Sequence, residues 1–123
     1  IYVLDTGIYT DHTDFGGRFS PGWFPPDNWG ILNGQNDGYG SVTSASCNNY
    51  AGGDHGTHVA STAAGTKYGA AKKATVIPVQ VVSCRQNWGT YSWFYGGIDW
   101  AISHDAAYRA TLTGSEPPGA SRA

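Results

Sequence analysis

The chain has 123 residues and a formal net charge of −2 at neutral pH, with 40% apolar and 13% charged residues. This length allows one domain with a modest core, and the composition fits neither a disordered chain nor a membrane span. A small negative charge provides no basic surface, so a nucleic-acid partner is not expected.

Cysteine content and composition indicate a secreted protein, and the first residue indicates processing. Two cysteines permit one intrachain disulfide, and many Gly, Trp and Tyr residues beside few Lys and Arg are typical of a secreted, loop-rich protein. The chain opens on Ile1 rather than Met, inside a predicted strand. We therefore expect a processed or partial sequence.

Residues 1–4 form a continuous apolar run, which predicts a strand buried on both faces of a parallel sheet. Asp5 follows directly, at the end of a sheet where open α/β folds place their active sites. A lone Asp at this position is more often a turn residue that ends the strand. Asp11 and Asp14, in the polar loop that follows, are interpreted as solvated residues.

Residues 20–53 are rich in Gly, Pro, Asn, Ser and aromatic residues, which predicts a long connection with one short strand near residues 41–43. Long connections are usually functional or mobile. Residues 74–82 predict a second core strand, in which Pro78 should lie at the start or where its missing N–H has no neighbour.

His55 precedes a run of small residues that ends at Gly65, so a helix should begin near it and stop there. Gly56 would let the backbone approach a neighbour closely. A histidine at a rigid loop-to-helix junction suits a catalytic base, but a structural histidine pair is an equally good interpretation. His55 and His58 also have a spacing compatible with metal, although the glutamate of a zinc-protease helix is missing.

A second helix is predicted from Ser92, as its cap, to about Tyr108. Its buried stripe should comprise Phe94, Ile98, Ala101 and Ile102, and the glycine pair at residues 96–97 should allow close contact with the sheet. Trp93 and Trp100 are assigned to packing. Residues 111–123 have almost nothing to bury, so they are predicted to be a disordered tail.

Several blocks in one order resemble the subtilisin-like serine peptidases, most closely the proteinase K-like branch. The blocks are residues 2–8, His12 with residues 15–18, and residues 55–60, 68–73, 79–82 and 97–100. The resemblance implies a three-layer α/β fold, with a mostly parallel sheet and flanking helices. It also implies a partial peptidase domain over residues 1–110, followed by the tail.

The resemblance assigns roles to named residues. Asp5 and His55 would be the first two members of an Asp-His-Ser triad in the chain order of subtilisin, and His58 would make a structural hydrogen bond. Asn87, Trp88 and Gly89 match the segment that pairs with a bound peptide, although only Gly89 keeps its pattern. Trp88 would form an aromatic wall or pack under the loop.

The family also suggests a Cys47 to Cys84 disulfide, although Cys47 lies farther from the histidine than the family pattern has it. Two free thiols are the alternative. No metal or cofactor is expected, apart from a structural calcium ion in the complete domain.

The chain departs from the family in one decisive respect. The Gly-Thr-Ser-Met-Ala segment with the nucleophilic serine is absent, as is the oxyanion-hole asparagine. We therefore expect a fragment of a secreted serine endopeptidase that is inactive by itself. The isolated fragment should also be marginally stable or aggregation-prone, because sheet edges and apolar helix faces would stay uncovered. The complete enzyme would be a monomer that binds polypeptide substrates and its own propeptide, with neither nucleic acid nor membrane as a partner.

Three alternatives remain at this point. The chain would be a truncated, non-catalytic homologue, or a binding module that presents the aromatic residues of 20–53 to a carbohydrate or peptide. The third alternative is a metal protein that uses His55 and His58. The ordered blocks favour the peptidase, because none of the alternatives explains them.

Overall fold

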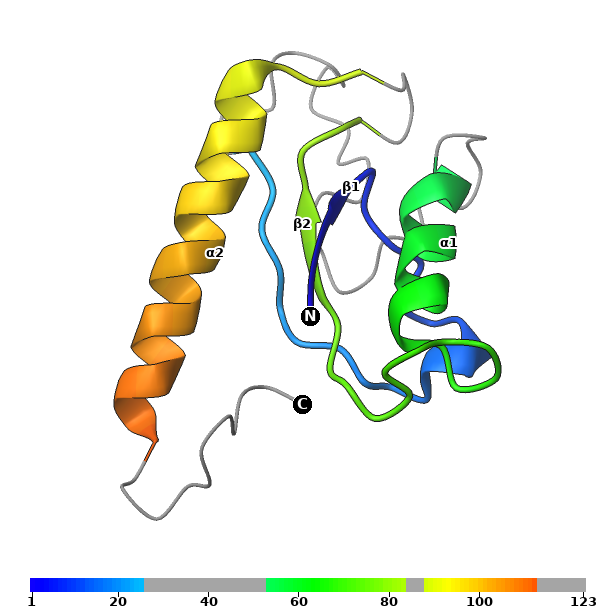
Figure 1. Cartoon of the computed structure of the whole chain (residues 1–123). Helices are drawn as coiled ribbons and strands as arrows, with labels where there is room; N and C mark the ends of the chain where they lie inside the picture. The colour runs from blue at the N-terminus through cyan, green and yellow to red at the C-terminus, as the bar shows by residue number, and fades with distance from the viewer. Residues whose placement is uncertain (26–52, 84–87, 113–123) are drawn as a thin grey trace.

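The structure is a computed structural model that describes residues 1–25, 53–83 and 88–112. Two helices lie on opposite sides of a pair of strands (Figure 1). In chain order the elements are β1 (Tyr2–Asp5), the 3-10 helix η1 (Thr13–Phe15), α1 (Gly53–Ala64), β2 (Ile77–Gln80) and α2 (Tyr91–Thr111). The predicted strand at residues 41–43 lies outside the described residues, as do the tail residues 113–123.

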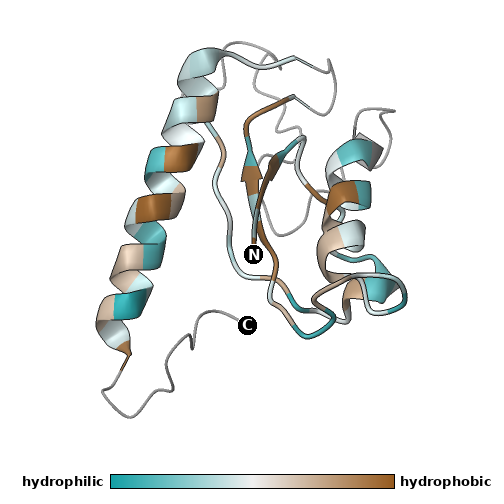
Figure 2. Ribbon diagram, viewed as in Figure 1, coloured by the Kyte–Doolittle hydropathy of each residue, from teal (hydrophilic) through white to brown (hydrophobic). Residues whose placement is uncertain are grey.

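β1 and β2 pair in parallel, with Tyr2 opposite Ile77 and Asp5 opposite Gln80. Both strands come from apolar runs, and Figure 2 shows hydrophobic residues along them. All of β2 is buried, whereas in β1 only Val3 is, so the expected burial of residues 1–4 on both faces is wrong. Among the described residues β1 has a neighbouring strand on one side only. A parallel sheet with flanking helices confirms the predicted fold class.

A third extended segment, residues 19–23, runs beside β2 and was predicted to be loop. Phe19 bridges Val76 and Trp23 bridges Val79, both in parallel. The sequence hid this segment because Pro and Gly at residues 21–22 are turn formers. Gly22 is required there, since a Cβ atom on it would lie 1.8 Å from the carbonyl oxygen of Pro78.

Pro78 is the second residue of β2 and faces this third segment. Amides of odd-numbered residues point to β1, as the bond from Ile77 N to Ile1 O at 2.8 Å illustrates. Amides of even-numbered residues point the other way, as Gln80 N does to Trp23 O at 2.9 Å. The missing N–H of Pro78 therefore interrupts the irregular outer pairing and leaves the β1–β2 ladder intact.

The core lies between α1, β1 and the loop around η1. Its buried members include Val3, Ile8, Phe15, Ala60 and Val76. The small residues of α1 allow this close packing, and α1 ends at Ala64, directly before Gly65 as predicted.

Arg18 joins three segments of the chain. Its guanidinium donates to the carbonyl oxygens of Ala74 and Ala64, each at 2.7 Å. The second of these carbonyls lies at the C-terminus of α1, where backbone acceptors lack intrahelical partners.

The interpretation of Asp14 as a solvated residue is wrong. Its Oδ1 accepts a hydrogen bond from Lys67 N at 3.0 Å, and its Oδ2 accepts one from Ser61 Oγ at 3.3 Å. Asp14 thereby ties the η1 loop to the end of α1. Partners so far away along the chain cannot be identified from a local sequence pattern.

α2 differs from its prediction in both its cap and its buried face. The cap is Thr90, not Ser92, because Thr90 Oγ1 accepts the hydrogen bond from Trp93 N at 3.1 Å. The predicted stripe is wrong as well: Phe94 is 45% exposed and Ile102 is 64% exposed, while Trp93 and Gly97 are buried.

The buried face of α2 follows from the closeness of the helix to the sheet. A Cβ atom on Gly97 would lie 2.6 Å from a methyl carbon of Val81, so a glycine lets the helix backbone rest on the strand residues. The close contact with the sheet predicted for the glycine pair is thus confirmed at Gly97, whereas a Cβ atom on Gly96 would lie 3.2 Å from the ring of Trp23. Within the described residues, neither helix combines the length and the apolar character needed to cross a bilayer.

The two tryptophans of α2 pack as predicted. Trp93 is 2% exposed and stacks on Trp88 with ring centroids 5.4 Å apart. Trp100 makes an edge contact with Tyr2 at 6.2 Å.

Candidate active site

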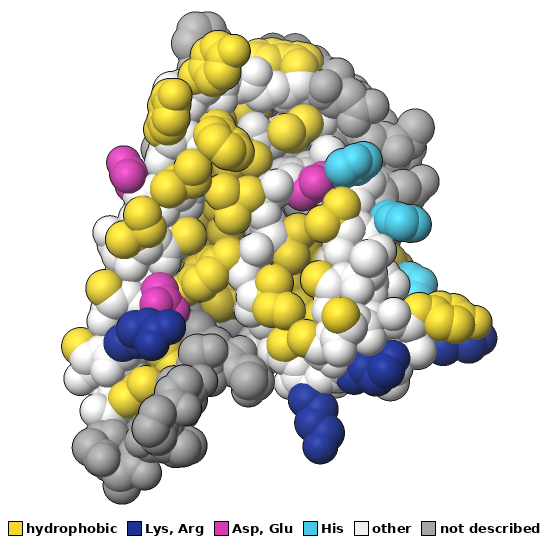
Figure 3. Space-filling view, in the orientation of Figure 1, with side chains coloured by type: hydrophobic (Ala, Val, Ile, Leu, Met, Phe, Trp, Pro, Cys, Tyr) yellow, Lys and Arg dark blue, Asp and Glu magenta, His cyan; other side chains and the backbone are white. Residues whose placement is uncertain are grey.

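The site is built around a contact between Asp5, the last residue of β1, and His55, in the first turn of α1. His55 Nδ1 lies 2.8 Å from Asp5 Oδ1 and 2.9 Å from Asp5 Oδ2. The Asp5 side chain is 13% exposed and the His55 side chain is 70% exposed. The histidine is therefore held from one side and open to a reactant on the other. Figure 3 shows an acidic side chain against a histidine on this face of the molecule.

The backbone at the end of β1 orients the Asp5 carboxylate. Thr6 N donates to Asp5 Oδ1 at 2.7 Å, and Val81 N donates to the carbonyl oxygen of Asp5 at 3.0 Å. An ionised carboxylate can only accept hydrogen bonds, so this geometry requires a proton on His55 Nδ1. In a neutral imidazole Nε2 is then the acceptor, as a general base needs.

The first turn of α1 is clamped onto the turn after β1. Gly56 N, one of the helix amides without an intrahelical acceptor, donates to Thr6 Oγ1 at 3.0 Å. A Cβ atom on Gly56 would lie 2.1 Å from the carbonyl oxygen of Gly7, so only glycine fits. The predicted close approach at Gly56 is confirmed. Tyr9 N also donates to Thr57 Oγ1, at 2.9 Å.

The neighbouring histidine has a different environment. The side chain of His58 is exposed and makes no hydrogen bond with a described residue, contrary to the structural bond predicted for it. Within residues 1–25, 53–83 and 88–112, no group of three or more His, Cys, Asp or Glu side chains is placed to hold a metal ion.

The predicted peptide-binding segment is described in part. Asn87, Cys47 and Cys84 lie outside the described residues, and the disulfide prediction with them. Gly89 lies against β2's continuation: a Cβ atom on it would be 2.2 Å from the carbonyl oxygen of Val81. Trp88 stacks on the buried Trp93 while remaining 41% exposed, so of its two predicted roles the packing role is observed.

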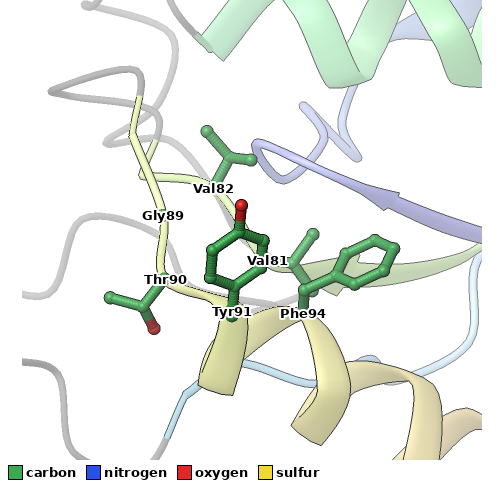
Figure 4. A pocket seen from close by; sticks show the side chains of 6 residues that line it. All are labelled: Val81, Val82, Gly89, Thr90, Tyr91 and Phe94. Carbon is green, nitrogen blue, oxygen red and sulfur yellow. The ribbon is translucent and has the colours of Figure 1, made fainter.

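An apolar pocket of about 760 Å³ opens beside Gly89 (Figure 4). Its lining residues come from the segment directly after β2, the segment before α2 and the first turn of α2: Val81, Val82, Gly89, Thr90, Tyr91 and Phe94. Of these residues, only Gly89 was predicted to bind a peptide. Phe94 was missed because it was assigned to the core, and its exposure is the consequence of how α2 is rotated.

Comparisons with known proteins identify the family of the chain. Residues 1–110 match the family model described as the Subtilase family. A subtilisin-like serine protease from Penicillium rubens is 40% identical over 111 residues, which are 90% of this chain and 23% of that protein. One from Penicillium citrinum is 44% identical over 82% of this chain and 20% of its own length.

More distant relatives extend the same likeness. Alkaline serine exoprotease A of Vibrio alginolyticus is 35% identical over 84% of this chain and 16% of that protein. The crystal structure of a cold adapted subtilisin-like serine proteinase superposes with a TM-score of 0.61 and 36% identity, covering 83% of this chain and 31% of that one. The chain thus spans about a fifth of the length of its curated Penicillium relatives. By its matched residues and by its fold, the chain belongs to the subtilase family.

Proposed function

We propose that this chain is part of the catalytic domain of a secreted serine endopeptidase and that Asp5 and His55 are two members of its triad. The observation that carries the proposal is the contact of His55 Nδ1 with both oxygens of Asp5, from residues 50 positions apart in the sequence. A carboxylate that orients an imidazole, with the other ring nitrogen left as acceptor, is the arrangement that activates a hydroxyl nucleophile.

In the complete enzyme, His55 Nε2 takes the proton of a serine hydroxyl as the serine oxygen attacks the scissile carbonyl carbon. Asp5 stabilises the imidazolium that forms. The imidazolium then protonates the leaving amine, and the acyl-enzyme remains to be hydrolysed by water. The serine must come from outside these 123 residues, which contain no methionine and hence no Gly-Thr-Ser-Met-Ala segment.

The substrate is proposed to be a polypeptide in extended conformation. The backbone near Gly89 would pair with it as an added strand, which holds peptides with little regard to their sequence. The adjoining apolar pocket between Val82 and Phe94 suits one apolar side chain of the peptide.

The remaining features of the proposal concern the complete enzyme. It would be a secreted monomer with a Cys47 to Cys84 disulfide, folded with the help of its propeptide. It would need no cofactor beyond a structural calcium ion, and neither nucleic acid nor membrane would be a partner. The isolated chain would be inactive, because removing the nucleophile in subtilisin costs about a millionfold in turnover.

A chimaera tests the catalytic roles. Residues 1–110 of this chain would replace the matching segment of the Penicillium rubens protease, so that the other protein supplies the serine. We expect a peptidase whose kcat falls about a millionfold in His55→Ala and about ten-thousandfold in Asp5→Asn. His58→Ala is the matched control and should retain activity, because its side chain is exposed and unpaired with described residues.

The result also decides between the peptidase and its first alternative. A folded but inactive chimaera would favour a non-catalytic homologue, and an active chimaera that tolerates His55→Ala would refute the assigned roles. The isolated chain should remain unlabelled by a fluorophosphonate probe, whereas the chimaera should be labelled.

A further inference from the structure

Gln80 is a polar side chain in an unexpected place. It is the last residue of β2, it lies opposite Asp5 in the parallel register, and it is 0% exposed. Its side-chain Nε2 donates to the carbonyl oxygen of Thr6 at 2.8 Å. The mechanism above assigns nothing to this residue.

Thr6, the partner of Gln80, touches both sides of the Asp5–His55 pair. Its N–H donates to Asp5 Oδ1 at 2.7 Å, and its Oγ1 accepts from Gly56 N at 3.0 Å in the turn that carries His55. One buried residue therefore orients the carboxylate and anchors the histidine's helix. A displacement of Thr6 would therefore disturb both the Asp5 carboxylate and the first turn of α1.

Thr6 needs support because the next residue provides little. Gly7 has φ of 93°, a conformation that a glycine adopts without penalty but that does not restrict the neighbouring peptide as a side chain would. The bond from Gln80 fixes the carbonyl of the Thr6–Gly7 peptide from the side of β2. It closes a chain of contacts that runs from β2 through Thr6 to the first turn of α1.

Stability alone does not account for a glutamine at this position. Its Oε1 is buried with no hydrogen-bond partner among the described residues, which is costly in a protein interior. An apolar side chain of equal length would avoid that cost. We propose that Gln80 is a positioning residue that holds Asp5 and His55 in register through Thr6. The inference rests on the proposed function in taking that pair as the functional one.

The test compares Gln80→Met with the wild-type 123-residue chain by nuclear magnetic resonance. Methionine keeps the length of the side chain but has no amide donor. We expect hydrogen exchange of the Gly56 amide to become about fivefold faster. This is the factor by which the opening equilibrium should rise when the free energy of one typical hydrogen bond is lost. The ¹⁵N shifts of the His55 ring should move away from the tautomer with the proton on Nδ1. The unfolding midpoint should change little, because the unpaired Oε1 is removed as well.

Val79→Ala is the matched control. Val79 is equally buried in β2 but faces Gly97 rather than Thr6. This variant should lose stability while its Gly56 exchange in the native state and its His55 ring shifts stay at wild-type values. If Gln80→Met leaves the Gly56 and His55 signals unchanged, or if Val79→Ala alters them equally, the inference is wrong.

A second measurement needs no variant and covers the case in which Gln80→Met does not fold. A scalar coupling across the hydrogen bond should connect Gln80 Nε2 with the carbonyl carbon of Thr6 in the wild-type chain. Its absence overturns the inference. Neither NMR measurement depends on catalytic turnover. A negative result would therefore reject the role of Gln80 only, and the chimaera experiment would still test the proposed function.

Discussion

At the scale of single residues, the Asp5–His55 contact depends on backbone atoms packed so closely that a larger side chain would not fit. Gly56 lies against the carbonyl oxygen of Gly7, and Thr6 Oγ1 accepts the Gly56 amide. These contacts place the His55 ring where Nδ1 reaches both oxygens of Asp5. The pair is thus a product of close backbone approach as much as of its own two side chains.

Gly56→Ala should destabilise the chain by about 1–3 kcal/mol, because the added Cβ atom would overlap the Gly7 carbonyl. The loss is expected although alanine favours helices over glycine by about 1 kcal/mol. Urea unfolding followed by circular dichroism measures it. Thr62→Ala, on the exposed side of α1, is the control and should change the unfolding free energy by less than about 0.5 kcal/mol.

Asp5→Asn should change which nitrogen of neutral His55 carries the proton. The carboxylate that requires the proton on Nδ1 is gone, and an asparagine side chain also offers N–H donors to the ring. Ring ¹⁵N shifts near pH 8 should show the Nε2-protonated tautomer gaining population. Asp11→Asn is the control, because Asp11 is exposed and distant in sequence from α1; equal shifts in both variants would contradict the assignment.

At the scale of elements, α2 shows how one helix can offer two apolar faces. In the row predicted to be buried, Phe94 and Ile102 are exposed, and the row of Trp93 and Gly97 packs on the sheet. Both rows have helical spacing, so periodicity alone could not choose between them. The glycine decides, because only that face lets the helix backbone approach Val79 and Val81.

Two substitutions distinguish these faces of α2. Trp93→Ala should cost about 3–5 kcal/mol of unfolding free energy, as expected for a large buried side chain. Ile102→Ser should cost less than about 0.5 kcal/mol, because Ile102 is 64% exposed. Chemical denaturation of both variants measures the difference, and the reverse order would mean that the helix is rotated as the sequence pattern suggested.

Removing the N-terminal cap of α2 should lower the stability by less than removing Trp93 does. Thr90→Ala should remove about 1 kcal/mol of stability, because Thr90 Oγ1 accepts the hydrogen bond from Trp93 N. Ser92→Ala should remove less, since Ser92 lies inside the helix and its hydroxyl contacts only that of Thr90 among the bonds described. Equal losses, measured by thermal unfolding, would place the start of the helix at Ser92 after all.

At the scale of the whole molecule, apolar side chains gather on the outer face of α2 and around the pocket. Tyr91, Phe94, Tyr95 and Ile102 are all exposed there, and Figure 3 shows hydrophobic side chains gathered along the helix on this side. Adjacent exposed apolar side chains favour association with another apolar surface. This arrangement is the physical basis for expecting the isolated chain to be marginally stable or aggregation-prone.

Self-association should therefore depend on this face. Phe94→Ser combined with Ile102→Ser should lower the weight-average mass of the chain at high concentration, as measured by sedimentation. Tyr68→Ser is the control, because Tyr68 is 80% exposed but lies in the turn after α1. If the control has the same effect, association does not occur through α2.

Much of this protein is determined by local sequence. The apolar runs of β1 and β2 and the small-residue helix stopped by Gly65 were predicted from residues near one another in the chain, whereas the roles of Asp5 and His55 were expected from the family resemblance. Hydrophobic periodicity and turn chemistry act over a few residues, so they can be read without a structure. The pairing of residues 19–23 with β2 was hidden for the same reason, because its local signals are those of a turn.

Tertiary structure alone decided which surfaces meet. The rotation of α2, the capture of Asp14 by Lys67 and Ser61, and the contact of Gln80 with Thr6 all join residues that are far apart in the chain. Each results from close packing around particular small residues and from the need to satisfy buried polar groups. Those requirements act in three dimensions, so the family resemblance proposes Asp5 and His55 as a pair while only the fold shows how they are held.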